Sequence, residues 1–373
     1  MMWGRARGLA LMVAVFAVVA AACSSGGSDG GGSTGAGATG PDGTTPAAPS
    51  GTLRLFSYSD GFDPAYMTTF YQEYPDIDLQ TASFGSNDEA IAKLQAGFQA
   101  DVINSCVDEA TLEMVNKGLY APLDVSRLEN WDDIWPSMKE LPGVQVDGKV
   151  YLVPADAGTA GILYNADVVT TPPTSWLDLF DPRWAGRASM EDISVTAIDI
   201  GALANGISDP LDMTTDQLDQ VKNYLIDHRD QFRTFWKGAA DIKSQFKSGE
   251  VVIASGYPDY AKQLRKEGVN AQFAVAKEGQ MLWTCGYGIS PDAENLDAAY
   301  ALLNWYSSTP PQVYAATEFN YITSNMKVGD LLTPEAIKNS GLDTFGQASN
   351  AIPASPPNDR EAWVAAWTEV KAS

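Results

Sequence analysis

Residues 52–105 read TLRLFSYSDGFDPAYMTTFYQEYPDIDLQTASFGSNDEAIAKLQAGFQADVINS, and this stretch decides the fold class. Three short apolar runs have the length and composition of β-strands: TLRLFSYS (52–59), IDLQTAS (77–83) and DVINS (101–105). Two helical patterns separate them, FDPAYMTTFYQEY (62–74) and SNDEAIAKLQAGF (86–98). Strands that alternate with helices at this spacing predict an α/β fold with a parallel sheet.

The helix starts and the strand ends of this stretch are both marked. We expect Asp63 to cap the first helix, with Pro64 at its first position, and Ser86 with Glu89 to form a capping box for the second. Ligands of parallel sheets bind beyond the carboxyl ends of the strands. The first places to look for a site are therefore SYSDG (57–61) and SCVDE (105–109).

Length and charge narrow the class of protein. The chain has 373 residues, more than one hydrophobic core usually supports, and 45% of them are hydrophobic, so we expect two folded domains. With 24 basic and 47 acidic residues, the net charge is −23, which argues against nucleic acid as a partner. An acidic surface favours cationic solutes, although most of these carboxylates are expected to be solvated.

The N-terminus has the pattern of a secretory signal peptide over residues 1–22, with Arg5 and Arg7 ahead of an apolar run. The run AAAC at 20–23 resembles a bacterial lipobox, which implies a lipid on Cys23. Residues 23–51 are rich in Gly, Ser, Thr and Pro and predict a flexible tether, the alternative being a tail without a role. After the signal peptide no run approaches the roughly 20 apolar residues that span a bilayer. The folded body is thus expected in the periplasm or at the outer face of the cell membrane.

The usual signatures of enzymes and metal sites are absent from the sequence. There is no CxxC, no Cys/His cluster, no P-loop, no GxSxG and no GxGxxG after a strand. The only histidine, His228, lies in the charged segment IDHRDQF and is expected at an exposed helix end. We therefore expect no enzyme activity, no cofactor and no metal.

Five further segments resemble, in order, the periplasmic solute-binding proteins of ABC importers. They are GKVYLVPADAGTAGILYNADVV (148–169), TSWLDLFDPRWAGRASMED (174–192), FKSGEVVIASGYPDYA (246–261), KEGQMLWTCGYGIS (277–290) and DAAYALLNWYSSTPPQVYAATEFNYITSN (297–325). The first segment resembles the family's strand that crosses to the second lobe, and the next two resemble elements of that lobe. The fourth resembles the strand that returns to the first lobe, and the fifth resembles a long helix with its turn. FGSNDEAIAKL (84–94) adds a resemblance to the spermidine/putrescine-binding subgroup.

The resemblance implies a type II periplasmic-binding-protein fold, in which two α/β lobes, each a mixed sheet flanked by helices, are joined by a hinge. We expect lobe one to comprise 52–155 and 283–331, and lobe two 156–282 and 332–373. It further implies a monomer that binds a small solute between the lobes and delivers it to an ABC transporter permease. A secreted hydrolase using paired carboxylates and a surface adhesion protein are the competing classes.

The resemblance also implies the aromatic part of the site. Trp283 matches a stacking tryptophan, Tyr58 and Tyr257 fall where aromatic walls lie, and Tyr321 matches a ligand-facing tyrosine. Such rings would hold the methylene chain and the ammonium groups of a polyamine-like cation. The alternative for each ring is packing in a lobe core.

The sequence departs from the subgroup in its acidic residues. Cys285 stands where an acidic residue is expected, and a second family carboxylate aligns near Val195 or Thr196. Burial of an ammonium group without a counter-charge costs several kcal/mol. Either other carboxylates substitute, or the ligand is a betaine, an amino-acid derivative or another polar solute. The candidate substitutes, each of which could instead be a cap or a solvated loop residue, are Asp60, Asp108, Asp156, Asp192 and Asp259.

The resemblance places Cys106 and Cys285 at strand ends of lobe one, beside the ligand groove. Neighbouring cysteines of an exported protein are expected to form a disulfide if their Cα atoms come within about 7 Å. The alternatives are two buried free cysteines or, less favoured, a catalytic thiol.

Overall fold

The computed structural model describes residues 48–343, 345 and 351–373. The predicted signal peptide, Cys23 and most of the predicted tether lie outside these residues. Within the described part no helix is both long enough and apolar enough to cross a membrane.

The three strands predicted from residues 52–105 all form, and they build the sheet of the first lobe. Strands β1 (Gly51–Ser57), β2 (Ile77–Ser83) and β3 (Val102–Cys106) are parallel. Strand β11 (Gln280–Ile289) lies antiparallel between β3 and β6 (Val153–Asn165), so the strand order is β2-β1-β3-β11-β6. The helices and short strands of this lobe are α1 (Thr68–Glu73), α2 (Asn87–Gln95), α3 (Thr111–Asn116), α4 (Pro136–Lys139), α9 (Leu296–Ser307), α10 (Thr309–Tyr314), β4 (Gln145–Val146), β5 (Lys149–Val150) and β12 (Ile322–Thr323).

The two predicted helix starts differ in outcome. Ser86 caps α2 by accepting the Glu89 N–H at 3.2 Å, while the Glu89 carboxylate accepts the N–H of Gly85 at 2.8 Å instead of that of Ser86. The first helix begins at Thr68, later than predicted, because a separate turn capped by Asp63 precedes it. The Thr68 hydroxyl donates to the Pro64 carbonyl oxygen at 3.1 Å and so competes for an acceptor that a continuous helix would use.

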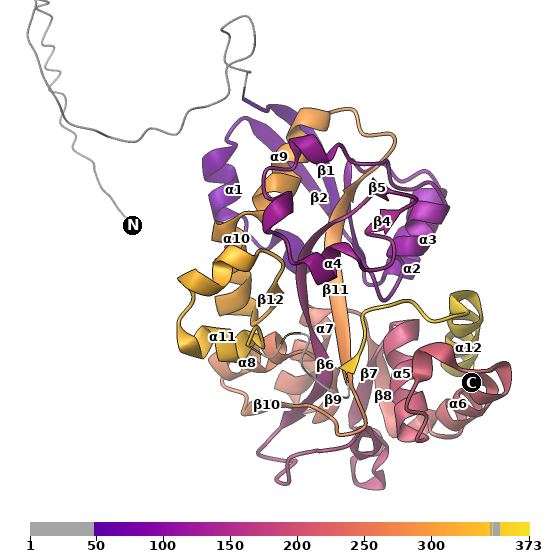
Figure 1. The fold of residues 1–373 in the computed structure, drawn as a ribbon. Helices are drawn as coiled ribbons and strands as arrows, with labels where there is room; N and C mark the ends of the chain where they lie inside the picture. Colours follow the sequence, from indigo (N-terminus) through magenta and orange to yellow (C-terminus); the bar gives the residue numbers. More distant parts are fainter. Residues whose placement is uncertain (1–47, 344, 346–350) are drawn as a thin grey trace, which may run out of the picture. The chain divides into compact units, whose positions relative to one another are not determined.

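The second lobe continues the same sheet beyond β6. The strand order there is β6-β9-β7-β8, with β10 paired to β6. The elements of this lobe are β7 (Ala188–Glu191), β8 (Phe232–Trp236), β9 (Ile253–Gly256), β10 (Ala271–Ala274), α5 (Ser194–Ala204), α6 (Thr215–Asp227), α7 (Ala239–Ser248), α8 (Pro258–Lys266) and α12 (Arg360–Ala372). Helix α12 packs on α5 and α6, where Trp363 and Trp367 are buried in the core of this lobe (Figure 1).

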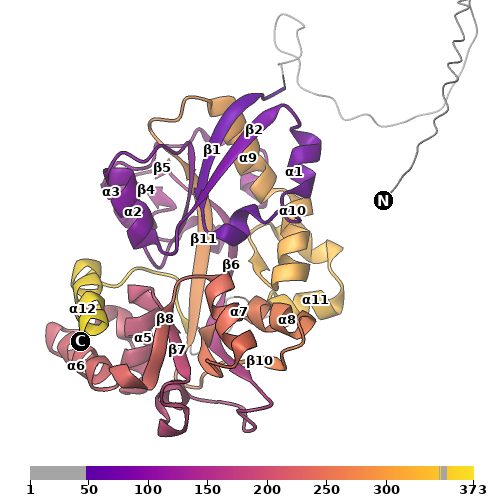
Figure 2. The same ribbon diagram turned by 180° about the vertical axis from the view of Figure 1, so that it is seen from behind.

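Strands β6 and β11 run through both groups of elements, side by side (Figures 1 and 2). Gly158 of β6 faces Trp283 of β11, and a Cβ at Gly158 would lie only 2.5 Å from the indole, so a larger residue cannot replace this glycine without movement of the ring. The hydrophobic cores of the two lobes are separate clusters of buried residues, two made by first-lobe elements and two by second-lobe elements. The two-lobe α/β fold predicted from the sequence is confirmed.

The segment after residue 331 divides between two environments. Helix α11 (Pro334–Ser340) packs on the π-helical turn Ala315–Phe319, whereas β13 (Ala351–Ile352) pairs with β11 and α12 joins the second lobe. The lobe boundaries themselves stay a prediction.

Candidate solute-binding site

A cavity of about 800 Å³, partly open to solvent, lies where strand ends of the two lobes meet. The first lobe contributes the loops after β1 and β3, the second lobe the end of β7, helix α5 and the start of α8, and β11 contributes a tryptophan. Its charged and aromatic lining consists of Tyr58, Asp60, Asp108, Glu109, Glu191, Asp199, Tyr257, Tyr260, Trp283 and Tyr321.

The cavity contains five carboxylates, and among the described residues that line it there is no Lys, Arg or His. Burial raises the pKa of Asp108 to about 7 and that of Glu191 to about 8. Burial, together with the negative charges of neighbouring acids, raises the pKa of Glu109 and of Asp199 well above the ordinary range. The empty site therefore disfavours ionised carboxylates, and a bound cation would relieve that cost.

Three tyrosine hydroxyls orient three of these carboxylates. Tyr58 donates to Glu109 at 3.0 Å and Tyr257 donates to Glu191 at 2.6 Å. The third bond, at 2.9 Å, runs from Tyr321 to Asp60. Each bond uses part of one carboxylate's acceptor capacity and leaves further lone pairs for a ligand.

Trp283 stands between the tyrosines of the two lobes. Its ring lies edge-on to Tyr321 at 4.9 Å and to Tyr257 at 6.1 Å between centroids. The indole is part of the cavity wall, and its buried Nε1 has no hydrogen-bond partner among the described residues. An aromatic face placed this way suits stacking of an alkyl chain or a cation.

The predicted disulfide is confirmed and forms part of the cavity wall. Cys106 and Cys285 are directly opposite each other on β3 and β11, with Cα atoms 3.9 Å apart. Because the bridge occupies the Cys285 position, that position supplies no charge. Two carboxylates lie close to it in the loop that follows β3: Asp108 accepts the Thr284 N–H at 3.3 Å, and Glu109 is the next residue.

The structure brings six of the nine predicted ligand residues together in this cavity: Tyr58, Asp60, Asp108, Tyr257, Trp283 and Tyr321. Asp156 lines a smaller adjoining chamber. Asp192 is turned toward α12, where it accepts the Trp367 Nε1–H at 2.9 Å and pairs with Lys371 at 2.7 Å. Asp259 is buried near the start of α8, accepts from Gln263 at 3.1 Å, and is not among the lining residues.

Three lining carboxylates were not predicted: Glu109, Glu191 and Asp199. Glu109 and Glu191 stand at strand ends, so the rule that selected Asp108 could have found them. Asp199 lies on α5 one helical turn after Val195, close to where the resemblance placed a carboxylate. Its sequence signal is a lone charge within the otherwise uncharged SVTAIDIGALA, since a buried charge needs a partner or a ligand.

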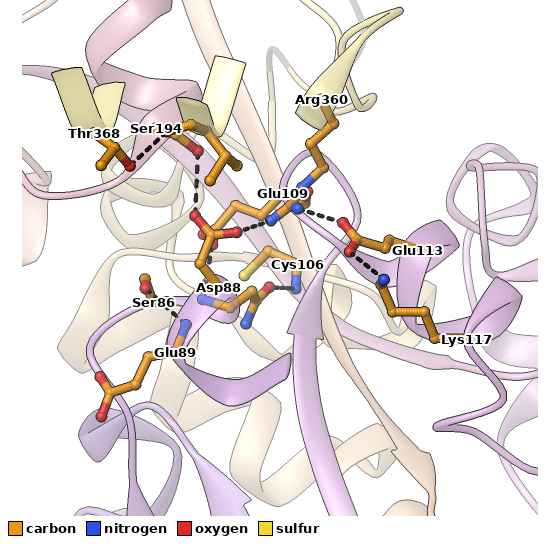
Figure 3. A network of polar contacts seen from close by, with 12 residues as sticks. Ser86, Asp88, Glu89, Cys106, Glu109, Glu113, Lys117, Ser194, Arg360 and Thr368 are labelled. Carbon is orange, nitrogen blue, oxygen red and sulfur yellow. Dashed lines mark hydrogen bonds and ion pairs between the residues drawn. The ribbon is translucent and has the colours of Figure 1, made fainter. Parts of the chain in front are cut away.

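Polar contacts join the two lobes beside the cavity (Figure 3). Arg360, the first residue of α12, donates to the Glu109 carbonyl oxygen and forms ion pairs with Asp88 of α2 and Glu113 of α3. The Ser194 hydroxyl at the start of α5 also donates to Asp88, at 3.4 Å. Through Arg360, α12 of the second lobe thus contacts the backbone of Glu109, which lines the cavity.

The described residues contain no group of three or more His, Cys, Asp or Glu side chains arranged to hold a metal ion. The carboxylates of the cavity come instead from both lobes, and the same lining includes five aromatic rings. This arrangement suits an extended organic ligand better than a point charge.

Comparison with known proteins agrees with this geometry. Residues 65–344 match the family described as bacterial extracellular solute-binding protein. The putrescine-binding periplasmic protein PotF of Escherichia coli is 25% identical over 354 residues, which cover 88% of this chain and 93% of that protein. A putative spermidine/putrescine ABC transporter protein from Listeria monocytogenes has the same fold, with a TM-score of 0.73 and 22% identity over 86% of this chain and 98% of that one.

A further structural match shows that this fold accepts other ligands. The binding protein MotA of A. tumefaciens B6, solved in complex with glucopine, has a TM-score of 0.73 and 20% identity, covering 86% of this chain and 99% of that one. The ligand therefore has to be inferred from the residues of the cavity. The family itself is clear: the chain belongs to the bacterial extracellular solute-binding proteins.

Proposed function

We propose that the protein binds an organic cation with two or more amino groups, of the polyamine class, and delivers it to an ABC transporter permease. The observation that supports this ligand class most directly is the lining of five carboxylates without a basic residue among the described residues of the cavity. Relatives named for putrescine and spermidine binding support the same class.

The walls of the cavity suit both parts of such a ligand. Ammonium groups would pair with the carboxylates, which then ionise because the cation offsets the cost of burial. The methylene chain would lie along Trp283 and the neighbouring tyrosines, each cation over a ring gaining about 0.5–2 kcal/mol. The charge that Cys285 lacks would come from Asp108, Glu109 and Asp199.

Zwitterionic and anionic solutes are disfavoured by the same lining. A betaine or an amino-acid derivative brings a carboxylate, and no described lining residue offers a positive charge to receive it. A neutral sugar brings no counter-charge, so the cost of ionising these buried carboxylates would remain. A small organic cation offsets that cost.

We further propose that the protein is exported as a monomer, anchored through Cys23, and performs no chemistry on its ligand. The signal-peptide and lipobox patterns of residues 1–23 support the first part, and membership in a family of solute-binding proteins supports the last. Permease recognition would occur on the surfaces of the closed lobes.

Thermal unfolding of the purified protein with putrescine, spermidine, agmatine, glycine betaine, 4-aminobutyrate and glucose tests the proposal. We expect the amines with two or more cationic groups to raise Tm, and mass spectrometry to recover them unchanged. A rise in Tm with the zwitterions or the sugar alone would contradict the ligand class. Turnover of the amine would contradict the transport function.

A further inference from the structure

A second, smaller chamber adjoins the main cavity, and the rings of Trp283 and Tyr321 line both spaces. The chamber encloses about 340 Å³, including space open to solvent, and it shares Tyr58, Asp60, Cys285 and the two ring residues with the main cavity. The rest of its wall includes Ser57, Asn104 and Asp156, which contribute polar groups, and the rings of Tyr66 and Tyr287. The solute proposed above could therefore extend from one space into the other.

The chamber contains polar atoms without partners. Ser57 and Asn104 are 0% and 4% exposed, and Ser57 Oγ and Asn104 Oδ1 have no hydrogen-bond partner among the described residues. Asn104 is oriented by its Nδ2, which donates to the Gly286 carbonyl oxygen at 3.0 Å, so Oδ1 remains as an acceptor. Unpartnered buried acceptors of this kind cost free energy unless a ligand or water reaches them.

Asp156 adds a negative charge to these acceptors. In the part of the chain that the structure describes, its carboxylate takes part in no hydrogen bond and no ion pair. Burial and the charge of Asp60 raise its pKa well above the ordinary range. No Lys, Arg or His occurs among the described residues of the chamber wall.

The fold keeps the chamber open. Ser57 ends β1, Asn104 lies on the adjacent β3, and Asp156 lies on β6 beyond the intervening β11. Gly61 also lines it, and a Cβ there would stand 2.4 Å from Ser57 Oγ and 2.6 Å from the Tyr287 hydroxyl. A side chain at Gly61 would therefore fill the space.

We propose that this chamber is a subsite for one terminal primary ammonium group of the solute, an inference that rests on the proposed function. A primary ammonium has three N–H donors, and the chamber offers three unpartnered acceptors from Ser57, Asn104 and Asp156. A quaternary ammonium has no N–H to donate, so it leaves those acceptors unpaired. An anionic head group is repelled by Asp60 and Asp156.

Calorimetry on the mature protein tests this subsite with 1,4-diaminobutane and its bis(trimethylammonium) analogue. The wild type is expected to bind the diamine at least tenfold more tightly than the analogue. Asp156→Asn should weaken diamine binding about tenfold or more and remove most of this discrimination. The matched variant Asp199→Asn, in the main cavity, should weaken both ligands and keep the discrimination.

Two calorimetric outcomes would overturn the proposal. If the wild type binds the diamine and Asp156→Asn binds it equally well, the subsite is wrong and the proposed function stands. If the wild type binds no amine, both are wrong. A crystal structure with the diamine gives a readout that needs no variant: an amine nitrogen in the chamber supports the subsite, and ordered water alone in the chamber refutes it.

Discussion

The two walls of the cavity hold their carboxylates in different ways. In the wall from the first lobe every acid has a donor: Glu109 accepts from Tyr58, Asp60 accepts from Tyr321, and Asp108 accepts a backbone N–H. In the wall from the second lobe, Tyr257 donates to Glu191, but Asp199 has a buried Oδ1 without a partner among the described residues. The first wall is pre-arranged, whereas the second has an acceptor that only a ligand or water can satisfy.

The disulfide is the main covalent difference between the walls, and its removal should have the largest effect. Cys106 and Cys285 are 179 residues apart, so the chain-entropy account gives a loss of up to about 5 kcal/mol of unfolding free energy. We expect the double variant Cys106→Ser, Cys285→Ser to lower Tm markedly. It should also weaken ligand binding, because the disulfide no longer fixes the β3 and β11 segments that position Asp108. Urea unfolding with and without reductant measures this, and equal midpoints for the oxidised and reduced wild type would contradict it.

The raised carboxylate pKa values of both walls predict how stability depends on pH. Glu191, with a pKa of about 8, and Asp108, with a pKa of about 7, bind protons more tightly in the folded state than in the unfolded one. The ligand-free protein should therefore lose a few kcal/mol of stability as the pH rises from 5 to 8. Putrescine should act in the opposite direction, since it binds the ionised carboxylates.

Thermal melts at pH 5, 6, 7 and 8, with and without putrescine, measure this pH dependence. Glu191→Gln is the matched variant and should flatten the slope of the ligand-free protein, because it removes the group with the higher of the two pKa values. A ligand-free Tm that rises steadily from pH 5 to 8 would contradict the origin we give to these pKa values.

Asp199 is the residue through which the second wall should depend most on ligand. We expect Asp199→Asn to weaken cation binding by about 2 kcal/mol, the scale of a charge-assisted hydrogen bond, and to stabilise the empty protein. Asp192→Asn is the control, since this acid sits just after β7 but pairs with Lys371 outside the cavity. If both variants lose affinity equally, the loss comes from the lower net negative charge of the protein and not from a contact between Asp199 and the ligand.

The two walls also differ in how far the sequence predicts them. The first lobe has parallel strands joined by helices, so its site residues follow strand ends, and the positions of those ends predict Asp60 and Asp108. The contribution of α5 could not be selected this way, because Asp199 lies inside a helix whose position depends on packing against α6 and α12. Asp192 follows a strand end yet points to α12, a contact made only after the chain has folded back.

Trp283 connects the two walls, and its removal tests whether they share one ligand. Its ring contacts Tyr321 on one side and Tyr257 on the other, on a strand that runs through both lobes. We expect Trp283→Ala to weaken diamine binding by about 1 kcal/mol or more in calorimetry, because the cation and its methylene chain lose an aromatic face. Trp283→Phe keeps a ring at that position and should recover most of the loss. If the alanine variant binds as tightly as the wild type, the ligand does not lie between the two walls, and the carboxylates of one wall alone must hold it.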